Sequence, residues 1–240
     1  GQFPCHNMSL LAHIPVSDFP TNSTNANDIW GHVDLNTMKE YALLGLRRGI
    51  ALVDVSDPIN PIIINAIEGQ NTTWRDIKVL QYFNPDANKW EAYAYATADN
   101  TSEGLSIITL SNPETGLVLV GRDVNDASAH NIYISNVDYG LNINNSTALP
   151  QVHMLGSNQF GGAMRSYSLT DPEQLQPTYI LSGATRSDYS HDASSFLVND
   201  ERAERDCVNT TSAGCTVLLD FNEQTLRLWD HSNLESAVEL

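Results

Sequence analysis

The stretch Gly49-Ile-Ala-Leu-Val-Asp-Val-Ser-Asp-Pro58 decides the fold, because the chain repeats it. Its pattern is a glycine, an apolar strand and a Ser-Asp-Pro turn. It returns as Gly104-Leu-Ser-Ile-Ile-Thr-Leu-Ser-Asn-Pro113, as Ala163-Met-Arg-Ser-Tyr-Ser-Leu-Thr-Asp-Pro172 and, in a decayed form, at 225–234. The three prolines are 55 and 59 residues apart. A nearly fixed period of this length is typical of repeat architectures such as propeller blades.

Further apolar runs flank each copy and predict four strands per repeat. Runs rich in Val, Ile, Leu and Tyr, broken by Gly, Pro, Asn and Asp, indicate strands and turns. The predicted opening strands are 28–33, 76–81, 131–135 and 192–198; the second strands are 40–46, 91–98, 151–156 and 216–221; the fourth strands are 62–67, 117–120, 178–181 and 237–240. No stretch shows a helical period with caps.

These patterns predict an all-β fold, a β-propeller of four-stranded antiparallel blades with four repeats in this chain. A set of separate β-sandwiches is the alternative. The predicted repeats are approximately 28–74, 75–129, 130–190 and 191–240. An N-terminal arm, 1–27, precedes them, and its apolar stretch 9–16 could add a strand to a blade of its own chain or of a neighbour.

The charge balance excludes two classes of partner. The chain of 240 residues carries 29 acidic and 12 basic residues, a net charge of -17. This charge repels nucleic acid phosphates and anionic lipid headgroups, and it attracts cations. A solvated acidic surface is the plainer interpretation. No apolar run is long enough to span a membrane. The chain starts at Gly1 without a targeting segment, which we interpret as a mature form.

Seven N-glycosylation motifs predict the compartment. Asn-X-Ser/Thr occurs at Asn7, Asn22, Asn71, Asn100, Asn144, Asn145 and Asn209. Nearly all lie in predicted loops, so we expect a secreted, extracellular or cell-surface protein that carries several N-linked glycans. At most one of the adjacent Asn144 and Asn145 should be modified, because two glycans would collide. The alternative is a bacterial surface protein whose composition yields the motif by accident.

The cysteines agree with an oxidising compartment. Cys207 and Cys215 flank a short polar segment that a disulfide could close. Cys5 is then left over: it is free, pairs with another chain or pairs with residues outside this sequence.

The openings of the four repeats carry polar side chains at matching positions. They read Asn27-Asp28-Ile29-Trp30, Arg75-Asp76-Ile77-Lys78, His130-Asn131-Ile132-Tyr133 and His191-Asp192-Ala193-Ser194. The first strand of a propeller blade lines the central channel, so these side chains would converge on one mouth. Oxygen and imidazole ligands there predict a site for Ca²⁺ or a transition metal, made by Asp28, Asp76, Asn131, Asp192, His130 and His191.

A structural role is the alternative for these residues. An Asp, Asn or His at the start of an inner strand can tie its blade to the next through hydrogen bonds to backbone amides. Arg75 could also neutralise Asp76 without any metal. His32, four residues past Asp28, could reach the same mouth.

Several motifs together resemble a known family. Asn27-Asp28-Ile29-Trp30-Gly31, Lys39-Glu40-Tyr41-Ala42-Leu43-Leu44-Gly45-Leu46, Val53-Asp54-Val55-Ser56-Asp57-Pro58 and Trp74-Arg75-Asp76-Ile77-Lys78-Val79 resemble, in this order, the choice-of-anchor B family of LVIVD-repeat proteins. Ala129-His130-Asn131-Ile132, Ser190-His191-Asp192-Ala193 and Phe3-Pro4-Cys5 fit the same family.

The resemblance covers nearly the whole chain and implies an extracellular or surface-attached β-propeller, with no enzymatic activity to transfer. Family members continue with further repeats beyond the position of Leu240, so this chain could be a fragment or a shortened form. The cysteines of its fourth repeat also depart from the family, which leaves Cys5 without a family-derived partner.

We therefore expect a scaffold or adhesion glycoprotein, more an interaction module than an enzyme, whose partners are other extracellular proteins, glycans or copies of itself. The alternative is a propeller that binds a metal or ligand, and could hydrolyse one, at the channel mouth. No cofactor is certain from the sequence; Ca²⁺ and N-linked glycans are the attached groups that it suggests first. The chain contains no Gly-x-Ser-x-Gly, His-Glu-x-x-His or phosphate-loop motif.

Overall fold

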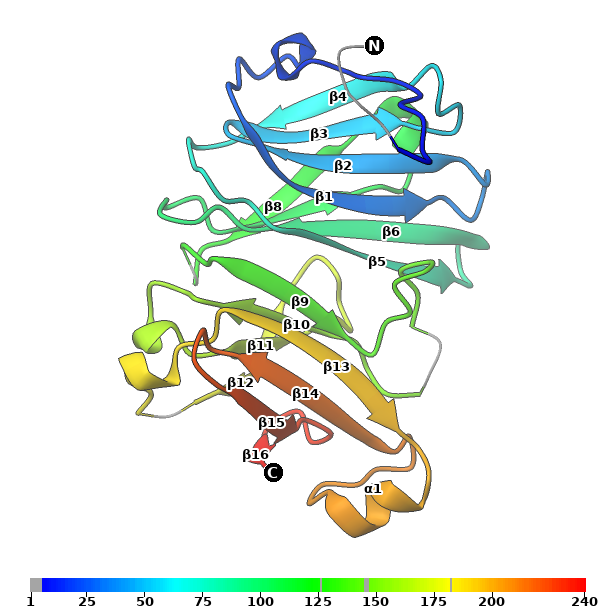
Figure 1. Ribbon diagram of the computed structural model, residues 1–240. Helices are drawn as coiled ribbons and strands as arrows, with labels where there is room; N and C mark the ends of the chain where they lie inside the picture. Colours follow the sequence, from blue (N-terminus) through cyan, green and yellow to red (C-terminus); the bar gives the residue numbers. More distant parts are fainter. Residues whose placement is uncertain (1–5, 126, 145–146, 182) are drawn as a thin grey trace.

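The protein is built from four antiparallel sheets of four strands each, which confirms the all-β prediction. The structure is a computed structural model that describes residues 6–125, 127–144, 147–181 and 183–240. In every sheet the strands are ordered as they follow in the chain, so each sheet is a meander of hairpins. Figure 1 shows the four sheets stacked in chain order.

The strands agree closely with the sequence pattern. Sheet 1 comprises β1 (Ala26–Val33), β2 (Glu40–Leu46), β3 (Gly49–Asp54) and β4 (Ile62–Glu68). Sheet 2 comprises β5 (Ile77–Asn84), β6 (Lys89–Ala96), β7 (Leu105–Thr109) and β8 (Val118–Asp123). Sheet 3 comprises β9 (Asn131–Ser135), β10 (Gln151–Leu155), β11 (Arg165–Ser168) and β12 (Gln176–Ile180). Sheet 4 comprises β13 (Asp192–Val198), β14 (Cys215–Phe221), β15 (Leu226–Asp230) and β16 (Val238–Glu239).

The helical elements are short. Four 3-10 turns are described, η1 (Val16–Asp18), η2 (Pro113–Thr115), η3 (Phe160–Gly162) and η4 (Arg186–Asp188). The α-helix α1 (Glu201–Asp206) was not predicted from the sequence, because six residues are too few for a helical period. The carboxylate of Asp200 caps it by accepting a hydrogen bond from the Arg202 amide at 3.0 Å. Among the described residues, no helix has the length and apolar character needed to cross a membrane.

The glycines of the repeated stretch have a steric cause. Gly49 and Gly104 enter the third strands of sheets 1 and 2 with φ of 143° and 78°. A Cβ at Gly49 would lie 2.0 Å from the carbonyl oxygen of Ile67, and one at Gly104 would lie 2.4 Å from that of Asp123. Both carbonyls belong to the neighbouring fourth strand, so only glycine allows this close pairing.

Apolar clusters fill the spaces between successive sheets. The inner strands β1, β5, β9 and β13 contact one another in that order. Leu43 and Leu52 of sheet 1 pack with Val79 and Ala94 of sheet 2. Comparable clusters join sheet 2 to sheet 3 and sheet 3 to sheet 4. The inner sheets therefore bury both of their faces, which is why their strands are apolar on both sides.

A buried arginine also connects sheets 1 and 2. The guanidinium of Arg75 is 1% exposed and pairs with Glu103, with N···O distances of 3.1 Å. It also donates to the carbonyl oxygens of Leu46 and Gln70. Arg75 does not neutralise Asp76, contrary to one suggestion from the sequence. Because its donors are shared between the carboxylate and carbonyls, the buried charge is well compensated.

The N-terminal arm packs against sheet 1. Ile14, Val16 and Phe19 lie on a cluster that includes Ala51 and Val53, on the face turned away from sheet 2. Within 6–25, the structure describes no strand, so 9–16 adds no strand to a sheet of its own chain. The arm covers one end of the array with side chains instead of with backbone pairing.

The predicted disulfide is present. Cys207 and Cys215 are bonded across a sequence separation of 8, and they link the end of α1 to the start of β14. Both sulfur-bearing residues belong to a small cluster with Ala203 and Val217. Cys5 lies outside the described residues.

Candidate functional site

The aspartates at the start of the inner strands connect neighbouring sheets. Asp28 Oδ2 accepts a hydrogen bond from the Ile77 amide at 3.0 Å, and Asp76 Oδ2 accepts one from the Ile132 amide at 2.9 Å. Each bond crosses from one inner strand to the first residues of the next. These contacts are the ones expected if the aspartates have a structural role and tie each sheet to the next.

The other two members of the column behave differently. Asn131 Nδ2 donates to the carbonyl oxygen of His191 at 2.9 Å, so sheet 3 is also connected to sheet 4. Asp192, in the last sheet, accepts a hydrogen bond from the amide of Ala193 in its own strand. The residues at this position of the first three repeats therefore connect each sheet to the next. Asp192, at the same position of the fourth repeat, bonds within its own sheet.

A lysine supplies a positive charge beside the carboxylate of Asp76. Lys78 Nζ forms an ion pair with Asp76 and lies 4.4 Å from the ring centroid of Trp30. Burial, followed by the neighbouring Asp76 carboxylate, raises the pKa of Asp28 to about 6, although Lys78 opposes this shift. The ammonium group thus compensates the charge of Asp76 without a metal ion.

The two predicted histidines do come together. His130 Nε2 and His191 Nε2 lie 3.1 Å apart, and their ring centroids are 4.6 Å apart. The other ring nitrogen of His130, Nδ1, lies 3.0 Å from Asp99 Oδ2. The hydrogen bond to Asp99 raises the pKa of His130, against the opposing effect of burial. We call Asp99, His130 and His191 the histidine centre.

Asp99 was not among the predicted site residues. It follows the second strand of sheet 2 and has no counterpart at a matching position of the repeat-opening motifs. Its only sequence signal is that it precedes the glycosylation motif at Asn100. Trp74, 46% exposed, lies edge-on to His130 with ring centroids 5.8 Å apart.

A second histidine cluster is enclosed between sheets 3 and 4. His153 is fully buried, with Nδ1 2.8 Å from Ser166 Oγ and Nε2 2.9 Å from Ser135 Oγ. His231 Nε2 lies 3.1 Å from the same Ser166 hydroxyl. Burial lowers the pKa of His153 and lowers that of His231 to about 4, so both stay neutral at neutral pH. With no exposed side, this network supports packing and is closed to a substrate.

One further group of potential metal ligands is already occupied. Among the described residues, Cys207, Cys215 and Asp230 place three potential ligand atoms within 4.8 Å of one another. The two sulfur atoms are bonded to each other, and Asp230 Oδ2 accepts hydrogen bonds from the Val208 and Asn209 amides. These groups therefore stabilise the loop after α1.

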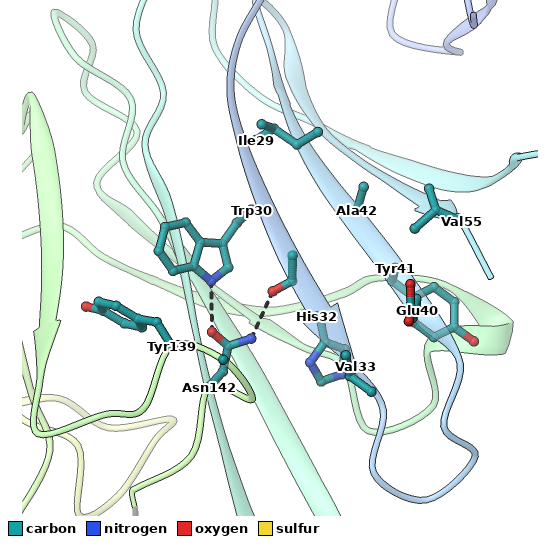
Figure 2. A pocket seen from close by; sticks show the side chains of 12 residues that line it. Ile29, Trp30, His32, Val33, Glu40, Tyr41, Ala42, Val55, Tyr139 and Asn142 are labelled. Atoms are coloured by element: carbon teal, nitrogen blue, oxygen red, sulfur yellow. Dashed lines mark hydrogen bonds between the residues drawn. The ribbon is translucent and has the colours of Figure 1, made fainter. Parts of the chain in front are cut away.

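A pocket of about 530 Å³ lies along β1 and was not predicted (Figure 2). Trp30 from β1 and Tyr139 and Asn142 from the loop after β9 line it. Asn142 Oδ1 accepts from Trp30 Nε1 at 3.0 Å, and its Nδ2 donates to the Gly31 carbonyl at 2.8 Å. Because these polar groups satisfy one another, the pocket presents mainly apolar and aromatic walls.

Two polar side chains at this pocket lack partners. His32 and Tyr41 are each 2% exposed, and their rings are stacked with centroids 6.4 Å apart. Neither ring nitrogen of His32 nor the Tyr41 hydroxyl has a hydrogen bond to a described residue. Burial lowers the pKa of His32 to about 4 despite the nearby Asp34. His32 therefore contributes an uncharged ring to the space between sheets 1 and 2 and does not belong to the histidine centre.

No protein-family model matches the chain, and a search of the curated proteins finds no match.

The connection between sheets can be tested at two matched positions. Asp76→Ala leaves the buried Ile132 amide without an acceptor and removes the partner of Lys78, so it should lower the free energy of unfolding by about 3 kcal/mol. Asp192→Ala removes the same side chain where it bonds only within its own strand, and should cost less than about 1 kcal/mol. Urea unfolding followed by circular dichroism measures both. Equal losses would show that the connection between sheets adds nothing.

The buried His32 should make stability depend on pH. Its folded pKa lies below its unfolded value, so the unfolded chain binds more protons between about pH 6.5 and pH 4, and stability is lost as the pH falls through this window. For this group alone the loss between pH 7 and pH 5 is about 2 kcal/mol.

His32→Leu removes the imidazole without breaking a hydrogen bond to a described residue. Unfolding curves at the two pH values should therefore show a loss about 2 kcal/mol smaller for His32→Leu than for the unchanged chain. If both chains lose the same stability, His32 is not the group that takes up the proton.

Proposed function

We propose that this chain is a run of β-propeller blades from a secreted glycoprotein, and that it serves as an extracellular scaffold whose last sheet binds a second copy of the chain. The observation that carries the proposal is the face of sheet 4 that is turned away from sheet 3. This face is apolar, and it is exposed where the corresponding faces of the other sheets are covered.

A column in the inner strands makes the comparison direct. Four residues after each member of the Asp28 column stand His32, Leu80, Ser135 and Phe196. The first three are between 0 and 2% exposed, whereas Phe196 is 52% exposed. In sheets 1 to 3 the side chain at this position is buried under the next sheet. Phe196, at the same position of sheet 4, is not buried in this way.

A column in the third strands gives the same result. Register places Leu52, Ile107, Ser166 and Leu228 at equivalent positions of their sheets. The first three are between 0 and 4% exposed, whereas Leu228 is 39% exposed. Leu219 pairs with Leu228, and Phe221 pairs with Leu226, so the exposed side chains form one continuous apolar face. Such a face, left open, is typical of an interaction surface.

A further four-stranded sheet of the same kind is the partner that this face fits. Sheets 1 to 3 present equivalent positions to the sheet that follows, and Asp192 stands where Asp28 and Asp76 reach the next inner strand. We assign this further sheet to a second copy of the chain, which carries the same open apolar face on its own sheet 4. The self-association test below distinguishes this contact from cover by a further repeat of the same protein.

The glycosylation motifs support secretion. Asn7, Asn22, Asn71 and Asn100 are exposed. The Nδ2 groups of Asn144 and Asn209 donate to the carbonyl oxygens of Ala148 and Ser236, and both side chains are half-buried. Asn145 lies outside the described residues. The disulfide is also compatible with an oxidising, extracellular compartment.

The propeller and the family are parts of the same proposal. Four sheets with their first strands side by side and a repeated connection between those strands support a propeller. The resemblance to the choice-of-anchor B family rests on the motifs that contain these strands. Glycans and other extracellular proteins are further partners that suit a scaffold of this type.

Glycan positions test the secretory part of the proposal. In chain expressed in a eukaryotic secretory host, Asn7, Asn22, Asn71 and Asn100 should carry glycans, because their side chains have space in the folded protein. Occupancy at Asn144 and Asn209 should be lower, since a glycan replaces a hydrogen on a nitrogen that is already bonded. Glycopeptide mapping before and after glycosidase treatment measures this. A chain without glycans would remove the argument for secretion.

Self-association tests the scaffold. The chain should form oligomers whose mass rises with concentration in light scattering. The double variant Phe196→Asp/Leu228→Asp should be monomeric, because two carboxylates on the face of sheet 4 would have to be desolvated in the contact.

Val118→Asp/Val120→Asp provides the matched control. These valines are 57% and 40% exposed on β8, at the outer edge of sheet 2, and this variant should associate like the unchanged chain. An unchanged chain that stays monomeric at all concentrations, or equal association of the two variants, would contradict the proposal.

A further inference from the structure

The histidine centre brings two imidazole nitrogens to a separation at which both could bind one ion. When neutral His130 donates its Nδ1 hydrogen to Asp99, its Nε2 keeps a lone pair, and this lone pair faces His191 Nε2 at 3.1 Å. A hydrogen on His191 Nε2 would make this contact an N–H···N hydrogen bond, whereas a metal ion between the two nitrogens would use both lone pairs.

The separation suits a metal ion. Zinc binds imidazole nitrogens at about 2.0–2.1 Å, and two nitrogens 3.1 Å apart then subtend an angle of about 100° at the metal. This lies close to the tetrahedral value. The carboxylate of Asp99 on the far nitrogen of His130 repeats the carboxylate–histidine–metal arrangement that fixes the tautomer and the ring orientation.

We propose that His130 and His191 bind one transition-metal ion of the zinc or copper type, with Asp99 as the residue that positions His130. The metal's remaining coordination positions are open to solvent or to a group from a bound molecule.

The donor set selects against Ca²⁺, the cation first suggested by the sequence. Calcium prefers oxygen ligands, and Asp28 Oδ2 and both oxygens of Asp76 already accept hydrogen bonds from backbone amides or from Lys78. Imidazole nitrogens suit zinc, copper and nickel. The six residues of the predicted site therefore divide: four are used in backbone connections, and the two histidines are left for the metal.

The surroundings keep the centre both ordered and open. A Cβ at Gly156 would lie 2.8 Å from the Cβ of His130 and 2.9 Å from the Tyr189 hydroxyl, so this glycine makes room for the packed rings. The side chain of His130 remains 20% exposed, and that of Asp99 remains 15% exposed. Trp74 stands beside the ring at the surface, where its fluorescence can report a bound ion.

Calorimetric titration with Zn²⁺ tests the proposal. The untagged chain should carry Cys5→Ser, because a thiol next to His6 could bind zinc independently. One ion should bind per chain. His130→Ala and His191→Ala should each weaken binding at least about tenfold by removing a ligand, and Asp99→Asn should weaken it about tenfold by loosening His130.

His13→Ala is the matched control, since His13 is an exposed histidine of the N-terminal arm, and its affinity for zinc should be unchanged. Cu²⁺ should quench the fluorescence of the unchanged chain and quench that of His130→Ala less. Circular dichroism establishes that each variant is folded. Absence of binding up to millimolar Zn²⁺, or equal affinity in the folded histidine variants, would show that the two histidines do not bind the metal and would overturn the proposal.

Discussion

The structure depends on one constraint: a sheet whose two faces are both apolar must have a neighbour on each side. The hydrophobic term is proportional to the apolar area removed from water, so a sheet of this kind is stable only within a stack. The aspartate connections set the position of each neighbour. Asp28 and Asp76 fix where the next inner strand begins, because each carboxylate accepts its amide hydrogen there. The packed clusters and the buried Arg75–Glu103 pair follow from that placement.

The two ends of the array meet this constraint in different ways. At sheet 1 the N-terminal arm supplies Phe19 and its neighbours to the outer face. At sheet 4 the corresponding cover is limited to the region of α1, where Ala203 packs with Val217. Phe196 and Leu228 lie beyond this region. The proposed scaffold function follows from the same constraint: the open apolar face of sheet 4 needs a neighbouring layer, as the faces of the other sheets do.

The sequence predicts the strands well because their causes are local. Strand 131–135 and strand 192–198 have the predicted bounds, since alternation and turn residues act over a few positions. Gly49 and Gly104 mark the third strands because any Cβ there would strike the fourth strand. The arm shows where prediction from local sequence fails. The segment 9–16 is apolar enough for a strand, but Ile14 and Val16 pack on the face of sheet 1 instead, and this depends on a distant part of the chain.

The site was predicted less completely because its partners are distant in the chain. The repeated openings predicted that His130 and His191 lie close together, and their Nε2 atoms are 3.1 Å apart. Asp99 could not be found this way, since it approaches His130 from another sheet and lies outside the repeated openings. Lys78, in contrast, lies in the opening that contains Asp76, but the pattern alone did not show that it forms an ion pair with that carboxylate.

Footprinting by hydroxyl radicals and mass spectrometry on the protein from its natural source tests the central claim most directly. The account predicts that Phe196 and Leu228 are oxidised much less in the native assembly than in dilute recombinant chain, while Val118 is oxidised equally in both. Equal oxidation of Phe196 and Leu228 in the two samples would mean that the face of sheet 4 stays open to water, and would contradict the account.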